Sequence, residues 1–293
     1  MILPHAAASV IDLLTLEGLG DDRFVSRAVL DDGLRLYGGL TFALCVRAAA
    51  LTAHSSFVPH SVQCSFVHAG DPAAVIELAV ERDRDGRSFA TRTVTARQNG
   101  RLLARATVSL QVPEVGTDAQ VDRMPVAPGP DGLPSFAVPR LLSMEGRLPP
   151  QPHPRDDWPT RFWVRCTAPF DTADTGLQAS IAAYLSDISS GLVPLSDDDW
   201  SYGPSLNHTL WLHRPVRMDD WLLFDLVPHT AAGGRGWYTG TLSTVDGILV
   251  GSIAQEALFR AAGRHSNTPL ELVRAALAGP SERANSDERQ DAE

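Results

Sequence analysis

Three polar side chains in the second half of the chain have types that suit the activation of a water molecule. They are Asp187, Ser205 and Gln255. A carboxylate can act as a general base, while a hydroxyl and a primary amide can hold a water beside a carbonyl carbon. None of the three is a strong nucleophile by itself. The combination therefore favours attack by an activated water on a carbonyl group.

Taken alone, each of these residues also has a structural explanation. Asp187 fits a solvated surface acid, Ser205 a hydroxyl at a strand start, and Gln255 a buried amide bonded to backbone. The position of Asp187 favours function, because it falls in the last turn of an expected helix over 177–190. The helix dipole disfavours a negative charge there, so something other than helix stability keeps this acid.

Patterns for other catalytic chemistries are missing from the sequence. Ser205 lies in Gly-Pro-Ser-Leu-Asn, which lacks the second glycine of the G-x-S-x-G nucleophile elbow. His208 and His213 do not have the spacing of an H-E-x-x-H zinc site. The three cysteines are isolated from one another, and we expect them to be buried. We therefore predict no metal ion and no cofactor.

The elements that must position these residues occur in two similar copies. His60 precedes Arg87 as His208 precedes Arg235, since 87 − 60 and 235 − 208 both give 27. In each copy an Asn-Gly or Asp-Gly pair, a strong hairpin signal, then precedes a last strand. The period is too long for a solenoid repeat. The sequence therefore predicts the duplication of a whole helix-plus-sheet domain.

Each copy is expected to contain one helix and a set of antiparallel strands, which is an α+β fold class. The helices fall at 36–52, where the residues are apolar all round, and at 177–190. A capping-box pattern at Ser9 predicts a short leading helix. Alternation in the strand 205–211 puts His208 on the opposite face to Ser205. The other predicted strands are 23–29, 61–67, 74–83, 88–98, 102–111, 161–165 and 248–259.

Composition divides the chain into four segments. Residues 1–112 form the first repeat, and residues 161–262 form the second, which carries the catalytic residues. Residues 113–160 are rich in proline and are predicted to be a linker. Residues 263–293 hold a short helix over 269–278, followed by a tail that has too few apolar residues to offset its ordering entropy.

The two copies differ in where their acids lie. From Gly33 to Gly70 there is no Asp or Glu, so the first copy has no carboxylate on or near its helix. A catalytic carboxylate carried by a helix is available only in the second copy. We predict one active site per chain.

The charge balance narrows the range of partners. With 25 basic and 35 acidic residues, the net charge is −10, which argues against nucleic acid because neutralising its phosphates requires clustered positive charge. The N-terminus lacks the basic segment of a secretory signal, and no apolar run reaches the length of roughly 18 residues that spans a membrane. We expect a cytoplasmic protein with no membrane partner.

A series of short motifs runs through both copies. They are Leu36-Tyr37-Gly38-Gly39, His60-Ser61 with Phe66, Gly70-Asp71-Pro72, Asp85-Gly86-Arg87-Ser88-Phe89-Ala90-Thr91-Arg92, Gln98-Asn99-Gly100, Ala183-Tyr184-Leu185-Ser186-Asp187, Asn207-His208-Thr209-Leu210-Trp211-Leu212-His213-Arg214-Pro215, Asp220-Trp221-Leu222-Leu223 and Gln255-Glu256. In this order they resemble the acyl-CoA thioesterase II (TesB-like) family, which has a double hotdog fold. The proline-rich middle is the only long stretch outside the resemblance.

The resemblance implies hydrolysis of fatty or related acyl-CoA thioesters to free acid and CoA by a bound water. Matched motif by motif, Asp187 is the catalytic base, and Ser205 and Gln255 orient the water. Ser205 stands where relatives usually have Thr, so the hydroxyl is kept but the methyl that helps to fix χ1 is lost. Family members also tend to form homo-oligomers, so we expect a dimer or tetramer.

The same match assigns five residues to substrate binding, namely Gly38, Gly39, His60, Arg87 and His208. Backbone N–H groups near a helix N-terminus are the usual donors to a developing oxyanion, although the sequence does not identify them. The phosphates of CoA are expected to meet some of the arginines of the first copy, which are Arg82, Arg84, Arg87, Arg92, Arg97, Arg101 and Arg105.

Two other functions are compatible with the sequence. Because Ser205 replaces the usual Thr, the chain is also compatible with a catalytically weak or inactive protein of the hotdog fold that binds acyl-CoA or an acyl carrier. A hotdog hydratase is less favoured, because no Asp and His are arranged close in the sequence as those enzymes have them.

Overall fold

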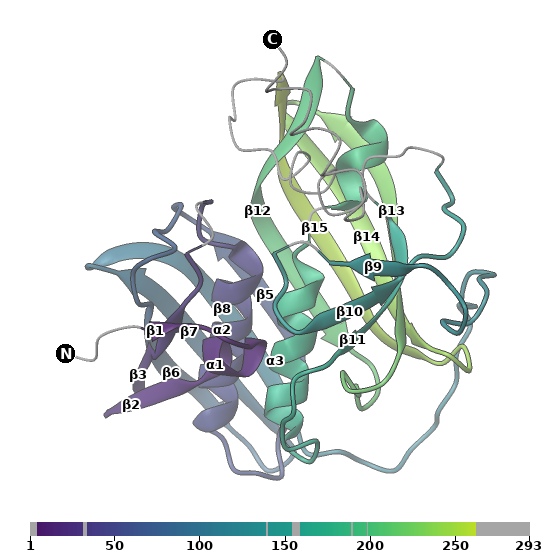
Figure 1. Cartoon of the computed structure of the whole chain (residues 1–293). Coiled ribbons are helices and arrows are strands. Elements are labelled where there is room, and N and C mark those ends of the chain that lie inside the picture. The colour runs from purple at the N-terminus through teal and green to yellow at the C-terminus, as the bar shows by residue number, and fades with distance from the viewer. Residues whose placement is uncertain are drawn as a thin grey trace.

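The computed structural model describes residues 5–31, 34–138, 140–153, 159–188, 190–197 and 199–261. The predicted helix over 269–278 and the tail after it lie outside the described residues. Most strands join one sheet of 13 strands, in the order β2-β3-β6-β7-β8-β5-β12-β15-β14-β13-β11-β10-β9. Two helices, α2 and α3, lie side by side at the centre of the molecule (Figure 1).

The N-terminal half folds its sheet around α2, which contacts β5, β6, β7 and β8. All but a few side chains of this helix are buried, as expected for a helix that is apolar all round. The capping box at Ser9 is confirmed, because Ser9 and Asp12 bond each other's backbone N–H. The elements are β1 (His5–Ala6), α1 (Val10–Leu14), β2 (Leu16–Gly20), β3 (Arg23–Ser26), β4 (Ala28–Val29), α2 (Gly38–Leu51), β5 (Val58–Phe66), β6 (Glu77–Asp85), β7 (Phe89–Gln98) and β8 (Arg101–Gln111).

The C-terminal half repeats the helix and the antiparallel strands. Asp174 caps the N-terminus of α3 by accepting a hydrogen bond from the N–H of Leu177 at 2.8 Å. A short 3-10 helix, η1, follows α3. The elements are β9 (Ser135–Ala137), β10 (Met144–Arg147), β11 (Arg161–Cys166), α3 (Thr175–Ser186), η1 (Ser190–Leu195), β12 (Trp200–Leu212), β13 (Leu222–Ala232), β14 (Arg235–Thr244) and β15 (Leu249–Ala261).

Two contacts join the halves. β5 pairs with β12 antiparallel, with Val62 opposite Leu210, which makes the sheet continuous from one half to the other. α2 and α3 pack against each other in opposite directions: the start of α2 at Gly39 lies against Tyr184 near the end of α3, and Ala50 near the end of α2 lies against Gly176. Each end of the helix pair therefore combines the N-terminus of one helix with the C-terminus of the other.

Arg92, one of the arginines considered for CoA phosphates, is used inside the fold. Only 1% of it is exposed. Its Nε donates to Thr52 Oγ1 at 3.0 Å, next to the C-terminus of α2, and its guanidinium pairs with Asp85. Because this charge is buried and paired, removing it would leave polar groups without partners. Arg92 therefore stabilises the first half and is not available to a phosphate.

The proline-rich segment contributes two strands that the sequence did not predict. β9 pairs with β10, and β10 pairs with β11 at the far edge of the sheet. Trp163 of β11 donates from its Nε1 to the carbonyl of Pro128 at 2.8 Å, which fastens the segment further. The second part of the predicted linker thus belongs to the sheet.

The three cysteines are buried and free, as expected; they are Cys45, Cys64 and Cys166. Burial raises the pKa of the Cys45 thiol to about 12, which keeps this group protonated and unreactive at neutral pH. Across the described parts of the chain, no helix is both long and apolar enough to cross a membrane.

Candidate active site

Asp187 lies where α3 ends. The helix runs to Ser186, and Asp187 is its C-cap, with φ −86° and ψ 36°. The helix predicted to reach 190 is therefore shorter than expected, and η1 begins separately at Ser190. Only 3% of Asp187 is exposed. This excludes the solvated surface acid that was its structural alternative.

Ser205 shares a face of β12 with His208 because the strand contains a bulge. Ser205 of β12 pairs with Ala257 of β15, and His208 of β12 pairs with Gln255 of β15. Three steps along β12 therefore correspond to two steps along β15. The register shifts between Ser205 and Asn207. The prediction that Ser205 and His208 face opposite sides is wrong, since one extra residue reverses the alternation of side chains.

A chain of hydrogen bonds joins the three polar residues that the sequence put forward. Ser205 Oγ donates to Asp187 Oδ1 at 2.8 Å. Gln255 Nε2 donates to Ser205 Oγ at 2.7 Å. Gln255 is fully buried, in the place that its parity on the last strand predicted. The end of α3 and the middle parts of β12 and β15 thus bring together residues that lie up to 68 positions apart, since 255 − 187 is 68.

The Asp187 carboxyl has an altered acidity. Burial raises its pKa from 3.8 to about 7, while the hydrogen bond from Ser205 and the nearby Gln255 amide lower it by less. A carboxyl with a pKa near neutrality is a stronger base than an exposed one and is still partly ionised at pH 7. Such shifts gather at functional sites.

The first turn of α2 comes from the other half of the chain and lies directly against Asp187. A Cβ added to Gly38 would overlap Asp187 Oδ2 and would lie 3.3 Å from the ring of Phe66. A Cβ on Gly39 would lie 2.6 Å from the carbonyl oxygen of Tyr184. Both positions require glycine because backbone and side chains approach them so closely.

This helix N-terminus also brings hydrogen-bond donors to the site. The first N–H groups of an α-helix have no partner within the helix, and the N-cap of α2, Tyr37, makes no side-chain capping bond. Its hydroxyl donates instead to the carbonyl of Tyr184 at 2.8 Å. The N–H groups of Gly38 and Gly39, together with the helix dipole, favour a negative charge at this point.

His208 lies behind this cluster and is fully buried. Its Nε2 is 2.8 Å from Ser186 Oγ, and its ring packs edge-on against Phe42, with 4.8 Å between the ring centroids. Burial lowers the pKa of His208 to about 3, and the nearby Gln255 side chain raises it by less. The imidazole is therefore neutral at physiological pH. Its assignment to substrate binding stays a prediction.

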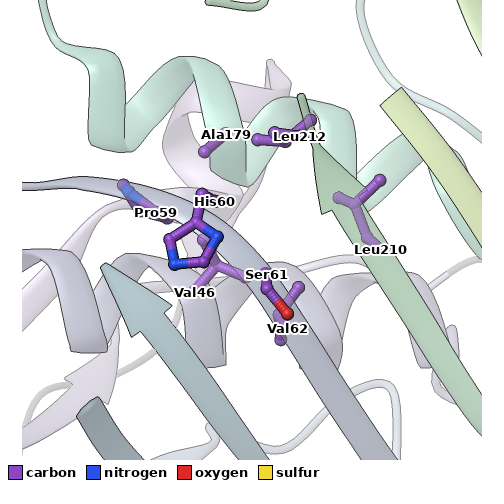
Figure 2. Close-up of a pocket in the computed structure, with 8 residues that line it drawn as sticks. All are labelled: Val46, Pro59, His60, Ser61, Val62, Ala179, Leu210 and Leu212. Carbon is purple, nitrogen blue, oxygen red and sulfur yellow. The ribbon is translucent and has the colours of Figure 1, made fainter. Parts of the chain in front are cut away.

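His60, on β5, lies beside a different part of the α2–α3 helix pair from Asp187. Its Nε2 is 2.8 Å from Ser109 Oγ, and its ring packs edge-on against Phe89. It lines a small pocket, open to solvent, with empty space of about 170 Å³. Figure 2 shows His60 between β5, α2, α3 and the end of β12, among side chains that are mostly apolar.

The position of this pocket along the helices places it away from the carboxylate. Its residue on α2, Val46, is eight positions after Gly38 (46 − 38), and its residue on α3, Ala179, is eight positions before Asp187 (187 − 179). Eight residues of helix correspond to about 12 Å. The structure therefore does not bring His60 to Asp187, and Arg87 is exposed in the turn between β6 and β7.

Three residues around the site were not put forward from the sequence. Tyr37 holds the start of α2 to Tyr184, Phe66 packs beside Gly38, and Ser186 bonds His208. In the sequence, Tyr37 and Ser186 stand within the same motifs as Gly38 and Asp187, and Phe66 accompanies the His60-Ser61 motif. Adjacency of this kind does not say which neighbours have a role.

Comparisons with known proteins agree with this fold. The model of the acyl-CoA thioesterase N-terminal domain matches residues 28–111, and that of the C-terminal domain matches residues 118–259. The chain is 30% identical to human acyl-coenzyme A thioesterase 8 over 292 residues, which cover 89% of this chain and 92% of the relative.

Solved structures extend the comparison. An acyl-CoA thioesterase II, TesB2, from Mycobacterium marinum superposes with a TM-score of 0.72 at 28% identity, covering 88% of this chain and 99% of that one. A hotdog-fold protein of unknown function from Alicyclobacillus acidocaldarius gives a TM-score of 0.70 at 19% identity, covering 85% and 97%. The expected double hotdog fold is confirmed. On these matches, the chain belongs to the acyl-CoA thioesterase family.

Proposed function

We propose that this thioester hydrolase cleaves fatty or related acyl-CoA with a water molecule that Asp187 deprotonates and that Ser205 and Gln255 orient. The observation that carries the proposal is the hydrogen-bonded chain from Gln255 through Ser205 to a buried carboxylate whose pKa is raised to about 7. The first turn of α2 lies against the same carboxylate. A base and oxyanion donors thus meet at one point.

The proposed reaction has two steps. In the first, water attacks the carbonyl carbon of the thioester while its proton passes to Asp187, and the carbonyl oxygen becomes an oxyanion. The N–H groups of Gly38 and Gly39 stabilise this charge, because preorganised donors act strongly in a site from which water is excluded. In the second step the C–S bond breaks, the free acid forms, and the proton on Asp187 passes to the departing thiolate of CoA. No metal ion or cofactor enters these steps.

The pH dependence of turnover tests the role of Asp187. The base acts only when ionised, so kcat/KM should fall about tenfold for each pH unit below its pKa of about 7 and should level off above pH 8. The loss of thioester absorbance, followed from pH 5 to pH 9, measures this directly. A profile that stays flat from pH 5 to pH 7 would contradict a base with this pKa.

Substitutions at Ser205 test the hydroxyl in the chain. Ser205→Ala removes the donor to Asp187 and the acceptor for Gln255, and should lower kcat by about 10- to 100-fold. Ser205→Thr keeps the hydroxyl, so its kcat should stay within about threefold of the wild type, with χ1 more firmly fixed. Equal rates for Ser205→Ala and Ser205→Thr would show that the hydroxyl is not needed.

Thiol release from acyl-CoAs of short, long, branched and aromatic acids tests the function as a whole. Release of CoA supports the proposed hydrolysis and gives the preferred acyl group. Binding of every acyl-CoA without release would favour the alternative, which is an inactive protein that binds acyl-CoA or acyl carriers. An enoyl-CoA that gains water at its double bond would favour a hydratase.

We further propose that the protein is a cytoplasmic homo-oligomer and that Gly38, Gly39, His60, Arg87 and His208 contribute to substrate binding, directly or through their neighbours. Exposed tryptophans on two strands of one sheet, with β15 between them, support an assembly, since 36% of Trp211 on β12 and 42% of Trp237 on β14 are exposed. Sedimentation of the purified protein distinguishes a monomer from a dimer or tetramer.

A further inference from the structure

The turn between β9 and β10 joins the proline-rich segment to the helix that carries Asp187 (Figure 1). The Tyr184 hydroxyl donates to the carbonyl of Arg140 at 3.1 Å and accepts from the N–H of Leu142 at 3.3 Å. Tyr184 is fully buried near the end of α3, three residues before Asp187. Residues 140–142, which we call the strap, are therefore fastened beside the proposed base.

The strap also contacts the start of α2, in the other half of the chain. The Arg140 guanidinium lies over the ring of Tyr37, with 5.8 Å from Cζ to the ring centroid. Its Nη2 donates to the carbonyl of Arg35 at 2.6 Å. Tyr37 is the N-cap of α2 and directly precedes Gly38. The strap therefore connects the helix of the base with the helix whose first N–H groups are the proposed oxyanion donors.

Tyr37 and Tyr184 set the position of α2 against α3 at this end of the helix pair. The Tyr37 hydroxyl donates to the carbonyl of Tyr184 at 2.8 Å, and the two rings meet edge-on with 5.4 Å between their centroids. A Cβ on Gly39 would lie 2.5 Å from the Tyr37 ring and 2.6 Å from the Tyr184 carbonyl oxygen. Both tyrosines thus pack directly on the first turn of α2, and Arg140 contacts both of them.

The backbone on either side of the strap has an unfavourable conformation. The φ angle is 63° at Arg140 and 60° at Ser143, the residue after the strap. Residues with a Cβ avoid this left-handed region, whereas Gly adopts it freely. Such conformations persist where surrounding contacts hold them, and they gather at functional sites. Ser143 bonds Val10 of α1 and Thr167 after β11, whereas Arg140 holds the tyrosines of the helix pair.

We propose that Arg140 is a positioning residue for the hydrolysis. It acts through Tyr37 and Tyr184 and holds the first turn of α2 at the distance from the Asp187 carboxylate that the reaction needs. This role rests on the proposed function, in which the first N–H groups of α2 stabilise the oxyanion. Misplacement of a reacting group by about 1 Å can cost about 100-fold in rate, so a residue that fixes this distance affects turnover without contacting the substrate.

Two substitutions separate the side chain of Arg140 from its strained backbone. Arg140→Gly and Arg140→Ala both remove the guanidinium, but only Gly adopts a φ of 63° without a steric penalty. We expect both variants to lower kcat by about tenfold with KM changed by less than about threefold, because bound substrate is still held. The Tm of Arg140→Gly should be the higher of the two. A kcat that is normal in Arg140→Gly and low in Arg140→Ala would overturn the proposal, because activity would then only follow stability.

Ser143→Gly is the matched control on the same turn. It relieves a φ of 60°, as Arg140→Gly relieves one of 63°, and removes the hydroxyl that accepts from the N–H of Val10. It should leave kcat unchanged. Equal losses of kcat in the two glycine variants would contradict the role of Arg140, since they would show that any loosening of this turn slows the reaction.

Tyr184→Phe tests the strap from the side of α3. The variant keeps the carbonyl that binds Tyr37 but loses the hydroxyl that bonds residues 140 and 142. It should lower kcat by about tenfold with KM nearly unchanged. In an Arg140→Gly background the further loss should be small, because both side chains support the same contact. Independent, multiplying losses would mean that Arg140 does not act through Tyr184.

Inhibitor binding gives a readout that a merely structural role would not move. A fluorinated ketone analogue of acyl-CoA adds water at its carbonyl and resembles the tetrahedral intermediate, whereas a thioether analogue has no carbonyl oxygen. Arg140→Gly should raise the Kd of the ketone by about tenfold and that of the thioether by less than about threefold, because the oxyanion donors contact only the ketone. Calorimetry measures both values. Equal changes in the two Kd values would overturn the proposal.

Asp187→Asn distinguishes a failure of the proposed function from a failure of the role of Arg140. If Asp187→Asn hydrolyses acyl-CoA as fast as the wild type, the proposed function itself fails. If that variant is inactive while Arg140→Gly and Tyr184→Phe turn over like the wild type, only the positioning role fails. An inactive Asp187→Asn together with a slow but stable Arg140→Gly supports both.

Discussion

Asp187→Asn should reduce the rate of acyl-CoA hydrolysis by about 10²- to 10⁴-fold, the range over which a general base contributes. Asn has nearly the shape of Asp and can still accept the Ser205 hydrogen bond, so the surroundings are kept while the base is lost. We expect acyl-CoA to bind with a Kd close to that of the wild type. Thiol release in single-turnover conditions and acyl-CoA binding by calorimetry measure the two quantities separately.

The same variant should be more stable than the wild type at pH 8. Asp187 titrates at 3.8 in the unfolded chain and at about 7 in the folded protein, so the unfolded state binds fewer protons between these values. Stability therefore falls as the pH rises from about 4 to 7 and is constant above. The full difference is on the order of 4 kcal/mol for a shift of three units. The gain in Tm of Asp187→Asn should grow from pH 4 to pH 7.

These two measurements exclude different explanations. An inactive variant that is also less stable at pH 8 would mean that Asp187 has mainly a structural role. Ordinary turnover by a stable variant would remove the base from the mechanism. Asp197→Asn, a change to an exposed acid beyond η1, is the control for loss of one negative charge.

Gly38→Ala is expected to produce the second large loss of activity, of about 100-fold, with the fold retained. The added Cβ would overlap Asp187 Oδ2, which is the end of a side chain that can rotate. Rotation relieves the overlap but takes the carboxylate away from Ser205. Ala is also the better residue within a helix by about 1 kcal/mol, so α2 itself should not be weakened. Circular dichroism and kcat measure the fold and the loss.

Gly39→Ala gives a different expected result from its neighbour. Its Cβ would lie 2.6 Å from the carbonyl oxygen of Tyr184, and backbone of a packed helix cannot rotate away. This variant should lose stability along with activity. At Gly116 nothing lies within 4 Å of a new Cβ, so Gly116→Ala is the control. Full activity in Gly38→Ala would show that the close approach of α2 to Asp187 is not needed.

Sequence patterns were sufficient for the secondary structure of the core. The apolar segment that became α2 and the alternating segments that became β7 and β8 were predicted to within about two residues, because their burial requires helical or strand periodicity along the chain. The end of α3 was not predicted, since Ile188 and the residues of η1 continue the apolar pattern after the helix stops. The strands β9 and β10 were hidden by the prolines around them.

The sequence by itself determined which side chains are available for chemistry. The absence of acids from Gly33 to Gly70 limits a helix-borne carboxylate to the second half, and Asp187, Ser205 and Gln255 stand in family motifs. Their types define a base, a hydroxyl and an amide, and type is a property of the chain alone. It does not require any knowledge of where the residues lie in space.

Only the tertiary structure decided that these groups meet. Strand alternation turned Ser205 away from His208, and the bulge that reverses it depends on the register of β12 against β15. The low acidity of Asp187 comes from burial by both halves, and Gly38 reaches it from a helix about 150 residues earlier, since 187 − 38 is 149. Register, burial and the packing of α2 on α3 arise from contacts between distant segments, so no local pattern in the sequence contains them.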